Sequence, residues 1–93
     1  MTLESDSRFV VKQISQAGVL VESSILVGLD ETVDLELILG QRKFVSPSRV
    51  AHVAEIEAEE EDRRYHLGLE FVDTQPRYRD VLEKFIRLEL DTG

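Results

Sequence analysis

The clearest strand signal in this sequence is the stretch TVDLELIL at residues 32–39. Apolar residues alternate there with Asp34, Glu36 and Ile38, so one face is wholly apolar and the other is largely polar. Strict alternation over this length is typical of a β-strand with one buried face. Gly40 and Gln41 follow directly, and because glycine suits the first central position of a tight hairpin, we predict a two-residue turn into the next strand.

Five further segments carry strand patterns. They are residues 8–14, 19–21, 42–45, 50–58 and 65–71. Pro47 separates the third segment from the fourth. Because proline cannot donate to a sheet ladder, we expect the chain to bend or to run along a sheet edge there.

The alternation also predicts which side chains share a face. In the first segment, Phe9 and Val11 lie on one face, and Val10, Lys12 and Ile14 lie on the other. In the long hairpin, one face carries Val50, His52, Ala54, Ile56 and Ala58, and the answering face carries Tyr65, Leu67, Leu69 and Phe71. Each strand is therefore expected to offer an apolar face to a common core.

After residue 75 the apolar period changes to that of a helix. The predicted stripe contains Tyr78, Val81, Leu82, Phe85 and Glu89, widened by Leu88. Thr74 or Asp73 is the expected N-cap, with Pro76 in the first turn, where its missing N–H costs nothing. About six strands followed by one helix predict a mainly β protein: a small six-stranded antiparallel β-barrel with a C-terminal α-helix, forming one domain over residues 1–93.

Composition and charge exclude several classes of function. The 93 residues carry 11 Lys and Arg against 19 Asp and Glu, a net charge of −8, which opposes attraction to nucleic-acid polymers and anionic lipid. The sequence contains no cysteine, which rules out disulfides and thiolate chemistry and fits a reducing cytoplasmic location. No apolar run is long enough to span a bilayer, so we expect no membrane insertion.

The sequence also lacks the constellations that enzymes and metal sites need. His52 and His66 lie on different arms of the predicted hairpin, without a carboxylate at metal-ligand spacing. The acidic run of Glu59, Glu60, Glu61 and Asp62 lacks the central glycine of a calcium loop, so a solvated hairpin tip is expected. We therefore predict no catalytic residue, no metal site and no cofactor.

The segment KQISQAGVLV, residues 12–21, resembles the second ligand-binding motif of the PilZ domain family. That motif places an acid or asparagine, a serine and a glycine around a turn, and here these positions are Gln13, Ser15 and Gly18. The order of the strands and the terminal helix is similar along most of the chain. The resemblance implies a six-stranded barrel and, in members that sense it, the bacterial messenger cyclic di-GMP as ligand.

Two departures from the PilZ pattern concern ligand binding. Gln13 replaces a short carboxylate that could accept two hydrogen bonds from a guanine edge. The Arg-x-x-x-Arg segment of the family lies well upstream of the turn, whereas only seven residues precede Arg8. Arg8 and Lys12 have the same mutual spacing, but Lys12 adjoins Gln13 on one strand and cannot belong to a separate arm. We therefore expect weak or no binding of cyclic di-GMP, because two phosphates lack paired guanidinium groups.

The resemblance implies a bacterial signalling or regulatory domain, and we expect it to act by docking a regulatory or motility protein. The candidate docking residues are Leu20 and Ile38 on outer strand faces, together with the acidic tip Glu59–Asp62. The alternative for Leu20 and Ile38 is that the C-terminal helix covers them. Two alternatives for function stay open. One is a cyclic di-GMP receptor completed by a second copy or by residues outside this chain, with Arg42, Lys43 and Arg49 as candidate contributors or simply as a solvated basic face. The other is an unrelated acidic β-barrel.

Overall fold

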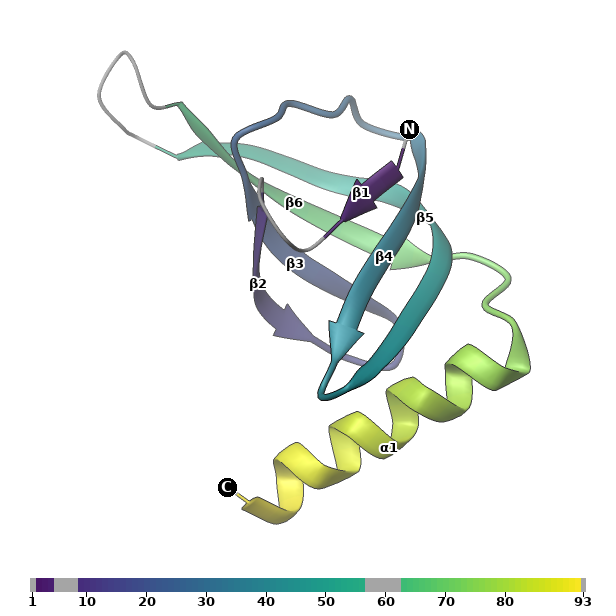
Figure 1. Ribbon diagram of the computed structural model, residues 1–93. Coiled ribbons are helices and arrows are strands. Elements are labelled where there is room, and N and C mark those ends of the chain that lie inside the picture. The colour runs from purple at the N-terminus through teal and green to yellow at the C-terminus, as the bar shows by residue number, and fades with distance from the viewer. Residues whose placement is uncertain (1, 5–8, 57–62, 93) are drawn as a thin grey trace.

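Five antiparallel strands curl into a half-barrel that one helix closes at its lower end (Figure 1). The computed structural model describes residues 2–4, 9–56 and 63–92. The elements are β1 (Thr2–Glu4), β2 (Phe9–Ile14), β3 (Gly18–Ser23), β4 (Thr32–Leu39), β5 (Arg42–Ile56), β6 (Arg64–Phe71) and α1 (Pro76–Thr92). Their order in the sheet is β1-β4-β5-β6-β3-β2.

The predicted mainly β fold with a C-terminal helix is confirmed, but the six-stranded antiparallel barrel is wrong in three respects. The segments 42–45 and 50–58 do not form separate strands, because β5 runs from Arg42 to Ile56 without a break. The sixth strand is instead the short β1, which pairs in parallel with β4 at Asp34–Glu36. Within the described ranges β2 pairs only with β3, so the sheet stays open between β2 and β4.

Pro47 is accommodated inside β5 because its missing N–H does not belong to the β4 ladder. The carbonyl oxygen of Pro47 accepts a hydrogen bond from the Val72 N–H at 2.8 Å, on the side of β5 away from β4. The N–H and C=O of one strand residue point to the same side, so proline removes no bond to β4. Strand β5 therefore continues through Pro47 without a break, while its pairing partner changes from β4 to β6.

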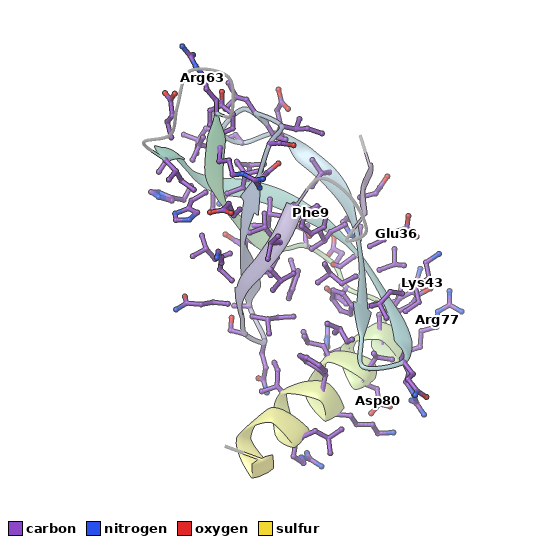
Figure 2. All side chains as sticks on the ribbon, turned by 60° about the vertical axis from the view of Figure 1, so that its left-hand side comes forward. Phe9, Glu36, Lys43, Arg63, Arg77 and Asp80 are labelled. Carbon is purple, nitrogen blue, oxygen red and sulfur yellow. The ribbon has the colours of Figure 1, made fainter. Side chains whose placement is uncertain are left out.

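The interior of the curl is filled by the alternating residues of β4 and by their neighbours. Val33, Leu35, Leu37 and Leu39 are all buried, as predicted, and the hairpin turn at Gly40-Gln41 pairs Leu39 with Arg42. Phe44 lies at the centre of the core, with its ring edge-on to those of Phe71 and Tyr78. Phe9 of β2 completes the core from the open side (Figure 2).

Two β-bulges overturn the predicted faces of β2 and β5. One extra residue at Lys12 turns Ile14, which was predicted on the face opposite to Phe9, towards the core beside Val19. An extra residue at Ala51 likewise turns Val53 inward, whereas His52 was predicted on the same face as Val50. Side chains alternate strictly with position, so one inserted residue exchanges the two faces beyond it.

The helix α1 begins with Pro76 at its first position, as predicted, but its N-cap is Gln75. The Gln75 carbonyl accepts hydrogen bonds from the N–H groups of Tyr78 and Arg79. Thr74 is not the cap because its hydroxyl pairs with that of buried Ser46 at 2.7 Å. The stripe of Tyr78, Val81, Leu82 and Phe85 packs on the core together with Ile86, while Leu88 is exposed. No helix in the described part of the chain is both long and apolar enough to cross a bilayer.

Candidate functional site

A shallow hollow of about 680 Å³ lies on the outer face of the sheet across β2, β3, β5 and β6. Its lining includes Gln13, Ser15, Gly18, Leu20, Gly68 and Glu70. The structure therefore brings together the three residues of the PilZ-like motif around one concave surface. Gly18 pairs with Glu70, and Leu20 pairs with Gly68, so the floor of the hollow is the β3–β6 ladder itself.

The two glycines make this surface concave because a side chain is missing at each. A Cβ on Gly18 would overlap the carbonyl oxygen of Leu69 on the neighbouring strand. A Cβ on Gly68 would stand 3.1 Å from the Cβ of His52. Close approach of neighbouring backbone is a common reason for glycine within a strand.

Ser15 organises the turn that forms one rim of the hollow. Its hydroxyl oxygen accepts hydrogen bonds from the N–H groups of Ala17 (3.2 Å) and Gly18 (3.3 Å), and the Ser15 N–H donates to the Gly18 carbonyl at 2.9 Å. The Ala17 carbonyl in turn accepts from the Phe71 N–H, which fixes the turn to β6. The motif serine is thus already engaged in holding the local backbone, as serine often is in turns.

Of the positively charged residues suggested by the sequence, those that the structure describes do not line this hollow. Lys12 occupies the β-bulge and is exposed on the other side of the edge strand β2. Arg8 lies outside the described residues. Gln13 is exposed and faces the hollow from β2, so the amide that stands where the PilZ motif has an acid or asparagine is available at its rim.

Glu70 is the one charged residue among the described residues that line the hollow. Its carboxylate accepts a hydrogen bond from Arg49 Nη2 at 3.0 Å, and Arg49 Nη1 is 2.5 Å from Asp30 Oδ1. The hydrogen bond to Glu70, which has the larger effect, and the hydrogen bond to Asp30 raise the pKa of Arg49 above its ordinary value. This guanidinium group is therefore committed to two carboxylates, and the hollow presents more negative than positive charge to a ligand.

The two apolar docking candidates lie in different places. Leu20 is half-buried and lines the hollow. Ile38 is 61% exposed and lines a second cavity of about 470 Å³ between β2 and β4, so the alternative that α1 covers Ile38 is wrong. The acidic tip Glu59, Glu60, Glu61 and Asp62 lies outside the described residues.

Sequence reasoning missed the part of the site contributed by distant strands. Ala51, Gly68 and Glu70 line the hollow, and Asp30 shares Arg49 with Glu70, yet of these residues only Arg49 was suggested by the sequence. An isolated glycine inside a strand pattern is a signal of close backbone approach and could have indicated Gly68. Of the two histidines, His66 lies 4.0 Å from Glu22 and His52 is exposed. Within residues 9–56 and 63–88, no group of three His, Asp or Glu side chains is arranged to hold a metal ion.

No family model, curated protein or solved structure matches this chain. The fold is a curled β-sheet with a C-terminal helix, and its outer face carries a shallow hollow whose one described charge is a carboxylate. Fold alone does not fix a function, so the functional argument depends on the chemistry of these surfaces.

Proposed function

We propose that this protein is a divergent PilZ-type regulatory domain of a bacterial signalling pathway, which acts in the cytoplasm by docking a regulatory or motility protein rather than by catalysis. It binds cyclic di-GMP weakly or not at all on its own. The observation that carries the proposal is the hollow at Gln13, Ser15 and Gly18, whose described lining has a carboxylate as its one charge.

Charge is the main reason that this hollow suits the dinucleotide poorly. The ligand carries two phosphates, and phosphate recognition in proteins depends on bidentate guanidinium groups or clustered backbone donors. Arg49 is the nearby cation, but Asp30 and Glu70 already hold it. A phosphate would have to displace both carboxylates, in a protein with a net charge of −8.

Exposed apolar residues support docking of a protein. Most apolar residues of the described chain form one core or pack against it. Five are instead more than half exposed: Val10, Leu26, Leu29, Ile38 and Leu88. Exposed apolar groups of this kind mark interaction surfaces when they adjoin a groove. Ile38 meets that condition because it lines the cavity between β2 and β4.

Titration calorimetry with cyclic di-GMP tests the proposal. We expect no measurable heat up to millimolar ligand for the wild-type chain. Micromolar binding that Gln13→Ala weakens would contradict the proposal and support the receptor alternative, since Gln13 lines the hollow. The matched control is Gln16→Ala, an exposed amide in the same turn that lies outside the hollow.

A second candidate function, a cyclic di-GMP receptor completed by a second copy, is favoured by one observation. All three motif residues line a single hollow rather than being scattered. If a second copy supplies the missing cations, adding cyclic di-GMP must raise the sedimentation coefficient of the protein. An unchanged monomer-sized boundary at millimolar nucleotide would remove this alternative.

A further inference from the structure

The cavity between β2 and β4, which we call the seam, is bounded by two strand edges and by the helix. Its lining consists of Val11–Ile14 from β2, Leu37–Leu39 from β4 and Phe85 from α1. We infer that the seam binds an extended segment of a partner protein, which adds a strand to the open side of the sheet. The inference rests on the proposed docking function and names where and how the partner binds.

The backbone of the seam indicates an extended occupant. In the described ranges β2 pairs only with β3, and Leu37–Leu39 of β4 pair only with β5. The short β1 covers the same edge of β4 only at Asp34–Glu36. Strand edges present unpaired N–H and C=O groups at strand spacing, and only another extended chain can satisfy several of them at once. A helical partner would leave these groups to water.

The side chains of the seam favour apolar residues at alternate positions of the segment. Ile38 is 61% exposed on the outer face, Val11 is 37% exposed, and Phe85 closes the inner end. Successive side chains of an added strand point to opposite faces of the sheet. The side chains on one face of the added strand would therefore contact Phe85, and those on the other face would lie beside Ile38.

Charge at the seam predicts an acidic residue in the partner segment. Lys12 is the one charged residue in the described lining, and the bulge exposes it. Lys43, the neighbour of Ile38 on β5, is held by Glu36 at 2.7 Å (Figure 2). Lys12 thus gives the seam a positive charge in a protein of net charge −8, and a carboxylate in the segment complements it.

A second copy of this chain is a less suitable occupant than a partner segment. An edge-to-edge pair of two β2 strands would bring two bulges and two Lys12 residues together. Bulges and edge lysines are the devices by which proteins prevent self-pairing of sheet edges. We therefore expect the protein alone to be monomeric at the seam.

Selection from a phage-displayed library of linear peptides, followed by fluorescence polarisation with the enriched synthetic peptide, tests the inference. We expect peptides that alternate apolar and polar residues and contain an acid. Ile38→Lys should weaken their binding roughly tenfold or more, because it places a charge in an apolar contact. Lys12→Glu should weaken it as well, and N-methylation at alternate peptide positions should abolish it by removing main-chain donors.

Leu26→Lys is the matched control, since Leu26 is 58% exposed and lies outside the seam. It should leave peptide binding unchanged, and both lysine variants should unfold at the wild-type urea concentration. Failure to enrich peptides, binding unaffected by Ile38→Lys, or tolerance of N-methylation would each overturn the inference. Dimerisation of the chain alone that Ile38→Lys abolishes would also overturn it, in favour of a second copy.

Comparing peptide binding with the cyclic di-GMP titration on the same protein distinguishes this inference from the proposed function. If peptides fail at the seam while cyclic di-GMP gives no heat, the seam inference is wrong and the docking proposal stands. If cyclic di-GMP binds at micromolar concentration through Gln13, the proposed function is wrong whatever the peptides do.

Discussion

The carbonyl oxygen of Leu69 occupies the space that a side chain on Gly18 would need. Gly18 begins β3, and Leu69 belongs to β6, which pairs with β3 along the floor of the outer hollow. The obstacle is backbone rather than a movable side chain, so any residue larger than glycine must push the two strands apart. The motif glycine therefore has a structural cause that is independent of any ligand.

Gly18→Ala should lower the free energy of unfolding by about 1–3 kcal/mol or more, the usual cost of overpacking a close contact. Gly28→Ala is the matched control, because its added Cβ would meet only the flexible end of Glu31. Urea unfolding of both variants measures the difference. Equal stability of the two would show that β3 and β6 can separate freely at Gly18.

Ser15→Ala should destabilise the protein by about 0.5–1.5 kcal/mol, because the N–H groups of Ala17 and Gly18 lose an acceptor. Ser15→Thr keeps a hydroxyl at this position and should recover most of the loss. Thermal unfolding provides the measurement. If threonine proves as destabilising as alanine, the hydroxyl is not what holds the turn.

Leu82→Ala should cost about 2–5 kcal/mol, because Leu82 is 2% exposed in the contact between α1 and the core. Leu88→Ala, in the same helix at a residue 64% exposed, should change the stability by no more than about 0.5 kcal/mol. Both variants replace leucine by alanine in the same helix, so comparing their denaturant unfolding separates the effect of burial from that of helix propensity. A small effect at Leu82 would mean that α1 contributes little to the fold.

Arg49→Gln should lower the melting temperature by less than about 4 °C, because exposed ion pairs contribute little. It should also reduce the sensitivity of stability to salt, since Asp30 and Glu70 lose their shared cation. Melting curves at low and high sodium chloride test both effects. Asp80→Asn, which removes the partner of Lys84 in the helix, is the control for an ordinary surface pair.

The raised pKa of Arg49 also fixes the pH range of this effect. A cation whose pKa is higher in the folded state stabilises that state below its unfolded pKa and loses the effect as pH rises through the folded value. Guanidinium groups reach that range only in strong alkali. The difference between wild type and Arg49→Gln should therefore stay constant from neutral to mildly alkaline pH, and a steady change there would contradict the assignment.

Local sequence patterns correctly predicted the elements in which the apolar period continues without an inserted residue. The alternation of residues 32–39, the turn at Gly40 and the stripe around Leu82 are all confirmed. The faces of β2 and β5 were wrong beyond Lys12 and Ala51, because an alternating pattern cannot reveal an inserted bulge residue. The merging of two predicted strands at Pro47 likewise depends on Val72, which is far away in the sequence.

The same division applies to the hollow. Gln13, Ser15 and Gly18 were predicted to lie together because they belong to one turn. The presence of Glu70 beside this turn, and its ion pair with Arg49, could not be predicted, because these residues come from strands that only sheet pairing brings beside the turn.

The pairing of β3 with β6 joins residues farther apart in the chain than any other antiparallel pair described, such as Gly18 with Glu70. Closing so long a loop costs more entropy than forming the tight hairpins, so we expect it late in folding. Newly synthesised chains would then form the β2–β3, β4–β5 and β5–β6 pairs before they form the hollow. A conformation-specific antibody raised against that surface would report completed folding rather than mere collapse.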